Sequence, residues 1–403
     1  MILLRCYPKV TDFIYEFFNH ASWADYRFIP IFSYGFWVAC GFFAAATLAV
    51  IEMRRRESLG LLAGQETEVI VGEAPNVIET AIYFIGGFIV FFKIIGLGNY
   101  HLPLTSGVLP LREYLFSLKG NWLLGVVGGI LIAGYMYSIK AKQKLPVPQK
   151  KKITLYPSDG VGDLVVIAAV LGVSGANFFN YLENPGDYAN FWQDPLGSMF
   201  SGLSVYGGLI FAGLGFGIYA YWKKFNILHF FDSVAPGFIL ANGLGRVGCH
   251  VAGDGDWGLA NPYNKPPWFP QFLWSDDYAH NIIDAEPMNV IPNCIEEHCT
   301  YLSHAAYPTP LYELLMCTAI FLILWSLRKR FTYQPGILFF IFMMLIGVQR
   351  YAIEQWRDVS GRDTYGFFGI QFRQSEIISI VMFTIGAAAV AYLLRKYKAT
   401  GVK

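Results

Sequence analysis

Charge is scarce in this sequence. Asp, Glu, Lys and Arg make up 15% of the 403 residues, against roughly 25% in soluble domains. Hydrophobic residues reach 55%, and they gather in long runs, whereas a surface helix of a soluble protein has one apolar and one polar face. The shortage of charge excludes an ordinary soluble protein and predicts a chain that lies within a membrane.

Other familiar signals are absent as well. Residues 1–28 lack the basic start, apolar stretch and cleavage site of a signal peptide, so we expect an amphipathic segment that lies on the membrane. There is no P-loop, and no GxGxxG motif follows a strand. The sequence therefore implies no cofactor, no bound metal and no nucleic acid partner.

What the sequence has instead is a series of apolar runs, each long enough to cross a bilayer as a helix. The nine runs lie near residues 29–52, 78–97, 121–139, 161–178, 205–222, 233–250, 310–327, 335–353 and 376–394. The fourth is interrupted near its start by Asp163. The predicted fold class is an all-α, polytopic integral membrane protein with about nine transmembrane helices.

Lysine and arginine are unevenly distributed between the predicted loops. Eighteen fall in loops on the side of the C-terminus and nine on the opposite side. Because cytoplasmic loops carry the excess of positive charge, we expect the N-terminus outside and the C-terminus in the cytoplasm. The long loop 252–306 then lies outside. There Cys294 and Cys299 can form a disulfide, stay free, or bind a metal with His298.

Two arginines lie where a predicted span ends on its outer side. The charge rule disfavours Arg246 and Arg350 at that end, and an ionisable group in a span is a functional hypothesis. Lys93 instead fits a side chain that extends to the interface. More polar residues follow each arginine, namely His250, Asp254 and Asp256 after the first, and Glu354, Arg357 and Asp358 after the second.

These arginines predict an anion site. Arg246, Arg350 and Arg357 would converge on a phosphate, which guanidinium binds through two hydrogen bonds, and a phospholipid head group is the phosphate available there. We expect Arg350 to pair with Glu354. Glycines near Arg246, Gly258 among them, would let the backbone approach a ligand, although helix packing explains several of them equally well.

Aromatic and acidic residues begin at the same outer face. Tyr34 lies near the start of the first span, Glu313 near the start of the seventh, and Tyr206 precedes Gly207 and Gly208 in the fifth. Most glycines of 204–217 fit contact between helices. The shared depth predicts one site, formed by Tyr34, Tyr206, Arg246, Glu313 and Arg357.

The order of these motifs resembles that of the bacterial prolipoprotein diacylglyceryl transferase family. The motifs are Tyr-Gly at 34–35, YGGL at 206–209, GRVG at 245–248 followed by an acidic residue and WG, LYE at 311–313, and RYAIEQWR at 350–357. The likeness covers roughly 20–52 and 161–394. It implies a first core helix, 29–52, an inserted helix pair with a basic cytoplasmic loop, 53–160, and a main transferase core, 161–403.

The resemblance implies an activity. The family moves a diacylglyceryl group from phosphatidylglycerol to the lipobox cysteine of prolipoproteins, which forms a thioether and releases glycerol phosphate at the outer face of the bacterial inner membrane. The implied partners are phosphatidylglycerol, prolipoprotein signal peptides and membrane lipids. The expected catalytic residues are Arg246, Arg357, Tyr34, Tyr206, Asp254 and Glu313. The expected substrate-binding residues are Arg246, Arg350, Gly207, Gly208, Gly258 and His250.

The sequence departs from the family at three positions. It has Tyr206 where the family commonly has His, Cys249 where it has Asn, and Asn177 where it has Arg. The general base therefore stays open, with His250 a further option because it titrates near neutral pH. The alternatives are a catalytically silent paralogue and a small-anion or lipid transporter. A transporter would need polar groups at the midplane, whereas these lie at one face.

Overall fold

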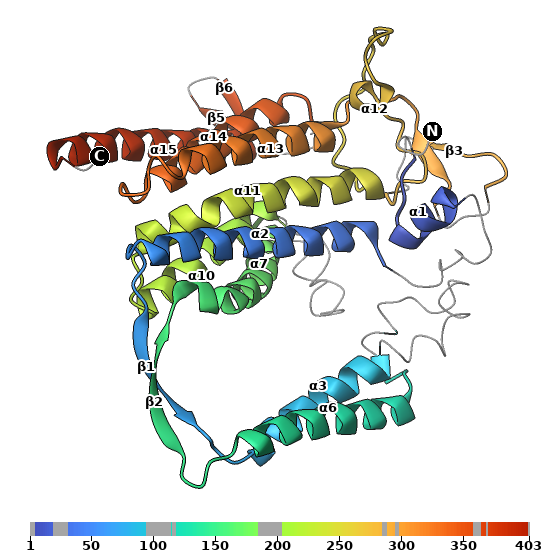
Figure 1. Cartoon of the computed structure of the whole chain (residues 1–403). Coiled ribbons are helices and arrows are strands. Elements are labelled where there is room, and N and C mark those ends of the chain that lie inside the picture. The colour runs from blue at the N-terminus through green and yellow to red at the C-terminus, as the bar shows by residue number, and fades with distance from the viewer. Residues whose placement is uncertain are drawn as a thin grey trace. The chain divides into compact units, whose positions relative to one another are not determined.

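The computed structural model describes residues 5–18, 31–93, 114, 118–183, 204–283, 288–294, 298–357, 364–367 and 370–401. The chain is mostly helical and divides into two compact units (Figure 1). Unit 1 comprises residues 1–13, 31–64 and 156–403, and unit 2 comprises residues 14–30 and 65–155.

Unit 1 is a bundle of long helices around α11. Its helices are α2 (Ser33–Ser58), α7 (Val161–Glu183), α10 (Val205–Trp222), α11 (Ile227–Ala252), α13 (Thr309–Leu327), α14 (Ile337–Glu354) and α15 (Gln374–Ala399). α11 packs against α2, α13 and α14, and α15 packs against α14 (Figure 1). Ile239 of α11, Leu324 of α13 and Leu338 of α14 are fully buried together in the core.

Small residues let neighbouring helices approach closely. A Cβ added to Gly41 of α2 would lie 2.9 Å from the Ala241 carbonyl oxygen of α11, and one added to Gly237 would lie 2.8 Å from that of Ala45. On α10, a Cβ on Gly207 would overlap the Gly175 carbonyl oxygen of α7. Such contacts hold helices together in lipid, where apolar burial gives no drive for association.

A buried ionic cluster joins three helices at the N-terminal end of α11. Arg56 is fully buried; its Nε lies 3.0 Å from Glu52 and its Nη1 lies 3.4 Å from Asp232 of α11. Asp232 also accepts hydrogen bonds from the backbone N–H groups of Gly336 and Phe339 at the start of α14. α2 continues six residues beyond the predicted end at 52, and this extra length brings Arg56 to the partners that a buried charge needs.

Short elements complete unit 1. The backbone N–H groups of Cys6 and Tyr7 donate to the carbonyls of Ala279 and Val251, so the N-terminal segment lies against the end of α11 and the loop after it. α1 (Val10–Phe17) follows this segment, and the boundary between the two units falls within this helix. Strands β3 (Met288–Val290) and β4 (Thr300–Leu302) pair antiparallel, and a Cys294–Cys299 disulfide closes the segment between them. β5 (Thr364–Phe367) and β6 (Ile370–Arg373) form a second hairpin; η4 (Pro157–Gly160) and α12 (Gln271–Trp274) are single turns.

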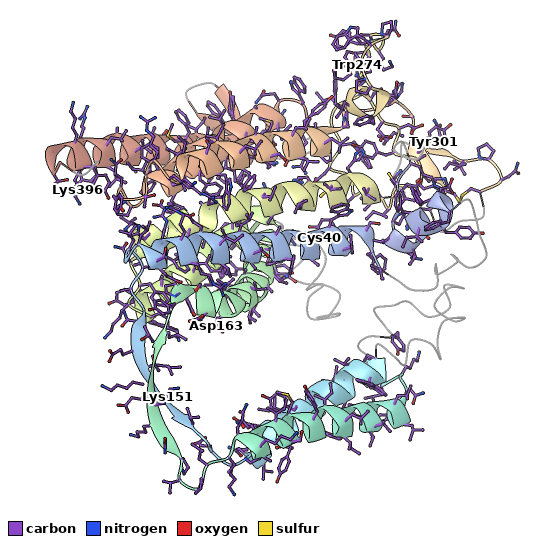
Figure 2. The ribbon with its side chains drawn as sticks, in the orientation of Figure 1. Cys40, Lys151, Asp163, Trp274, Tyr301 and Lys396 are labelled. Carbon is purple, nitrogen blue, oxygen red and sulfur yellow. A yellow bond between two sulfur atoms is a disulfide. The ribbon has the colours of Figure 1, made fainter. Side chains whose placement is uncertain are left out.

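Unit 2 consists of a helical hairpin and a strand pair. α3 (Val77–Lys93) packs antiparallel against α6 (Trp122–Gln143), and β1 (Gln65–Val71) pairs with β2 (Gln149–Leu155). The predicted basic loop therefore includes a strand, on which Figure 2 shows Lys151. Lys150 and Lys152 form diagonal ion pairs across the strands with Glu68 and Glu66, at 3.7 and 3.9 Å.

The described part of each of the nine predicted runs falls largely on a helix; residues 29–30 of the first run and 94–97 of the second lie outside the described residues. Seven of these helices are long and apolar enough to cross a membrane. The other two, α3 and the described apolar part of α10, are shorter. In the fourth run, Asp163 of α7 (Figure 2) accepts a hydrogen bond from the Tyr219 hydroxyl at 3.1 Å. The three two-stranded sheets are an addition to the predicted all-α architecture, and their strands lie in the polar segments between the apolar runs.

Candidate active site

The candidate site forms where α11 ends. Gly253 terminates the helix in the left-handed conformation, with φ +64°, and Gly255 follows with φ +90°. A Cβ on Gly253 would lie 2.7 Å from the Cys6 sulfur, so glycine is required there by space as well as by conformation. Because these two glycines reverse the chain, Asp256 returns to the end of α11 and meets Arg246, ten residues before it.

Arg246 is the centre of the site. It is 8% exposed, and its Nε lies 2.7 Å from the Glu313 carboxylate, while its Nη1 pairs with Asp256. Glu313 is buried near the start of α13, which begins at Thr309 and has Pro310 as its second residue. The Nη1 atom also lies 3.8 Å from the Cys249 sulfur, one turn further along α11.

Two more arginines join the same carboxylates. Arg350 lies 3.7 Å from Glu313 through Nη1, and its Nη2 lies 3.0 Å from Glu354, which confirms the expected Arg350–Glu354 pair. Arg357 pairs with the second oxygen of Asp256. Glu313 thus links Arg246 to Arg350, and Asp256 links Arg246 to Arg357. We call these six residues the arginine cluster: Arg246, Arg350, Arg357, Asp256, Glu313 and Glu354.

Backbone contacts fix the loop that carries Asp256. Gly258 forms a β-bridge with Arg357, and the Leu259 N–H donates to the Trp356 carbonyl at 2.9 Å. A Cβ on Gly258 would lie 2.5 Å from that carbonyl oxygen, so this glycine permits the close approach of two backbones. The Thr309 hydroxyl donates to the Asp256 carbonyl at 2.7 Å. These bonds hold the loop against the ends of α13 and α14.

Tyr34 lies beside this site on α2. A Cβ on Gly248 of α11 would lie 3.1 Å from the Tyr34 Cα, so the two helices touch close to Arg246. The Tyr34 side chain is 46% exposed. Tyr206 belongs to α10, but its side chain lies outside the described residues. Gly207 and Gly208, expected to bind substrate, approach the backbone of α7.

His250 belongs to a second, neighbouring cluster. Its Nδ1 lies 3.3 Å from the Tyr278 hydroxyl, and its Nε2 lies 3.7 Å from the Asp276 carboxylate. Burial raises the pKa of Asp276 to about 6, and burial likewise raises the pKa of Tyr278 well above its usual range. Tyr278 packs with Cys6 and Trp257 in a small core beneath the loop. Both imidazole nitrogens of His250 therefore face protein groups.

Three side chains have the spacing of a metal site. The ligand atoms of Cys249, Asp254 and Asp256 lie within 4.8 Å of one another. However, Arg246 and Arg357 pair with the two oxygens of Asp256, and Arg246 also approaches Cys249. Fixed positive charges at these ligand atoms oppose a cation, so the residues do not fit a metal.

Asp256 is the site residue that sequence reasoning missed. The family resemblance implies Asp254 as the acidic residue of this motif, but its carboxylate accepts the backbone N–H of Asp256 at 3.3 Å and orders the turn. The signal that could have found it is the pair of glycines, Gly253 and Gly255, since each predicts a reversal that moves Asp256 toward the helix end.

Comparison with known proteins identifies relatives. The model of the prolipoprotein diacylglyceryl transferase family matches residues 116–392, a range that begins inside the predicted insertion 53–160 and includes α6. The chain is 28% identical to the phosphatidylglycerol–prolipoprotein diacylglyceryl transferase of Streptococcus uberis over 66% of this chain and 87% of the relative.

Two further relatives carry the same name. The enzyme of Streptococcus mutans is 25% identical over 72% of this chain and 96% of its own length. Enzyme 1 of Clostridium perfringens is 28% identical, again over 72% and 96%. Since the family model spans more than half of the sequence, this chain belongs to the prolipoprotein diacylglyceryl transferase family.

Proposed function

We propose that this protein transfers the diacylglyceryl group of phosphatidylglycerol to the lipobox cysteine thiol of prolipoproteins. The names of the three relatives give that donor and that acceptor. The observation that carries the proposal is the arginine cluster, three guanidinium groups gathered around shared carboxylates at the end of α11. Lipid phosphate is the substrate group that this arrangement suits.

The carboxylates hold the guanidinium groups in place before a substrate binds. Glu313 and Asp256 each contact two arginines, so the three cations lie close together at the end of α11. A buried guanidinium without an acidic partner would be strongly destabilising, and the acids remove that cost. Because the positive groups are already oriented, a phosphate that takes the place of a carboxylate contact needs little reorganisation to bind.

The chemistry is a displacement at carbon. The cysteine sulfur forms a bond to the glycerol carbon of the diacylglyceryl group, and the bond from that carbon to the phosphate oxygen breaks. Glycerol phosphate leaves with the bonding electron pair, so negative charge grows on the phosphate. We assign Arg246 and Arg357 to stabilise that charge, Arg350 to bind the donor lipid, and Glu313 and Asp256 to orient the arginines.

The thiol proton needs an acceptor. His250 is a poor candidate, because both of its nitrogens face Tyr278 and Asp276. Glu313 is 2% exposed and lies between two arginines. Among the described residues, Asp254 is the acid of this loop with no arginine within ion-pair distance, and it is only partly buried. We therefore assign Asp254 as the acceptor of the thiol proton. We assign Tyr34, beside it, as a ligand to the lipid head group.

We further propose nine spans in the bacterial inner membrane, with the N-terminus and the site at the outer face. The excess of basic residues in the loops on the C-terminal side supports this orientation. The disulfide in the loop after α11 supports it too, because disulfides persist in oxidising compartments. The acceptor cysteine of an exported prolipoprotein emerges on that side.

The test is a transfer assay with the purified protein in detergent. Phosphatidylglycerol and a lipobox peptide should yield a lipidated peptide, seen by mass spectrometry, and an equal amount of glycerol phosphate. A peptide with serine in place of cysteine, and phosphatidylcholine in place of phosphatidylglycerol, should yield neither. If the folded protein gives no product from the matched pair, the transfer proposal fails and a catalytically silent paralogue takes its place.

A further inference from the structure

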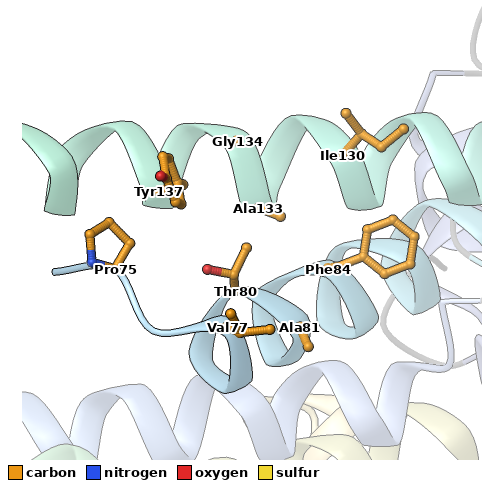
Figure 3. A pocket seen from close by; sticks show the side chains of 9 residues that line it. All are labelled: Pro75, Val77, Thr80, Ala81, Phe84, Ile130, Ala133, Gly134 and Tyr137. Carbon is orange, nitrogen blue, oxygen red and sulfur yellow. The ribbon is translucent and has the colours of Figure 1, made fainter.

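Unit 2 contains a groove formed by residues that are distant in sequence from the arginine cluster. It lies between the first turns of α3 and the C-terminal half of α6 and has a volume of about 570 Å³ (Figure 3). The lining residues are Pro75, Val77, Thr80, Ala81, Phe84, Ile130, Ala133, Gly134 and Tyr137. On each helix they recur at the spacing of one face, and the hydroxyls of Thr80 and Tyr137 are their only side-chain polar atoms.

The groove exists because the helices pack differently along their length. Toward its N-terminus, α6 fits closely against α3, and a Cβ on Gly129 would lie 2.8 Å from the Phe84 ring. Further along, no atom of the described residues lies within 4 Å of a Cβ added to Gly134. The small residues Ala81 and Ala133 line this part of the groove. The larger Phe84 and Tyr137 lie toward its two ends (Figure 3).

Two lysines lie at one end of this apolar groove. Lys140 follows Tyr137 by three residues and continues the same face of α6, and Lys144 is the residue directly after the C-terminus of that helix. Lys140 pairs with Glu79 of α3, but the two side chains are 37% and 43% exposed. Pairs this exposed contribute at most about 1 kcal/mol, so an incoming phosphate can take the place of Glu79. Lys144 is exposed.

The size of the groove favours a chain over a helix. Residues 77–84 span roughly 10 Å, and an α-helix of about 10–12 Å diameter laid along that length would need on the order of 1,000 Å³. The groove provides about 570 Å³, within the range of small-molecule sites. An apolar groove with lysines at one end is complementary to an anionic amphiphile, which has an apolar chain and a negatively charged head group.

We propose that the groove of unit 2 binds one anionic phospholipid, with an acyl chain between α3 and α6 and its phosphate at Lys140 and Lys144. None of these residues belongs to the arginine cluster, so this site is separate from the proposed transfer. The lipid would fill the groove that the small residues leave. It would thereby hold α3 to α6 at the end where the two helices do not pack closely.

Site-specific labelling tests the acyl part of this proposal. Phosphatidylglycerol with a photoactivatable diazirine in its acyl chain is bound to the purified full chain, and labelled peptides are mapped by mass spectrometry. Gly134→Leu fills the groove without a clash, and Gly86→Leu is the matched control, because Gly86 is an open glycine of α3 outside the lining.

Labelling of residues 75–84 and 130–137 should fall at least fivefold in Gly134→Leu and change less than twofold in Gly86→Leu. Labelling of the helices of unit 1 serves as an internal reference. Because the experiment measures lipid binding and not transfer, a negative result for this groove is distinguishable from a negative transferase assay. Labelling that Gly134→Leu does not reduce, or that is spread evenly over the exposed faces of the hairpin, overturns the proposal.

Competition tests the head group. Unlabelled phosphatidylglycerol should compete with the probe at least fivefold better than phosphatidylcholine does, and Lys140→Gln with Lys144→Gln should remove that preference. Equal competition by the two lipids in the wild type overturns the anionic part. So does a preference that survives both lysine substitutions. Melting temperatures in detergent establish that each variant is folded.

Discussion

Replacing Asp256 with Asn should lower the rate of diacylglyceryl transfer roughly 30- to 150-fold while the protein stays folded. The two oxygens of Asp256 pair with Arg246 and with Arg357. An asparagine has nearly the same shape, but it offers one carbonyl oxygen and turns an NH2 group toward the second guanidinium. One arginine therefore loses the group that orients it.

The magnitude follows from the contacts. Hydrogen bonds to charged groups contribute about 1.5–3 kcal/mol each, and two are affected. The Asp256 side chain is 23% exposed, so solvent screens part of this energy. A net loss of about 2–3 kcal/mol of transition-state stabilisation corresponds to the factor of roughly 30 to 150.

The assay measures kcat/KM for glycerol phosphate release, with Asp277→Asn as the control. Asp277 belongs to the same long segment between α11 and α13 and is exposed, so its substitution should change kcat/KM less than twofold. The reasoning is refuted if the two variants have equal kcat/KM, or if Asp256→Asn is as active as the wild type.

The remaining predictions concern stability and covalent structure. A Cβ on Gly248 would lie 3.1 Å from the Tyr34 backbone, so Gly248→Leu should lower the melting temperature by several degrees, since overpacking costs about 1–3 kcal/mol. Gly245→Leu is the control and should not lower it, because no described atom lies within 4 Å of a Cβ added there. Equal melting temperatures of the two variants would contradict the close contact at Gly248. Asp276 has a folded-state pKa of about 6, above the roughly 3.9 of an unfolded Asp, so it favours folding below pH 4, and that contribution is lost as the pH rises through 6. Asp276→Asn should therefore gain melting temperature relative to the wild type between pH 4 and 7, and a constant difference would disprove the shift. A thiol reagent should modify four cysteines of the denatured oxidised protein and all six after reduction, because Cys294 and Cys299 are bonded; six before reduction would rule the disulfide out.

The helices could be predicted because hydrophobic length is a local property of the sequence. The described parts of all nine predicted runs fall largely on helices, since an apolar segment of that length satisfies its backbone only as a helix in lipid. The ends were less accurate. The sequence places Arg56 in a basic loop, but in the fold it pairs with Asp232, whose position on α11 no local pattern reveals.

The site was predictable in its residues more than in its pairing. Arg246, Glu313, Arg350 and Arg357 come together, as their common depth suggested. The choice between Asp254 and Asp256 depended on backbone geometry at two glycines. His250 was assigned by its titration range alone, and its actual partners come from a loop 26 or more residues later.

The measurement that tests the central claim most directly is the rate of lipobox peptide lipidation by Arg246→Ala. Arg330→Ala is the control, because Arg330 is an exposed arginine outside the cluster. If the arginine cluster stabilises the leaving phosphate, Arg246→Ala should lose about 10²- to 10³-fold in kcat, as removal of a preorganised donor does elsewhere, and Arg330→Ala should stay within twofold of the wild type. A folded Arg246→Ala protein that transfers the lipid at the wild-type rate would contradict the account.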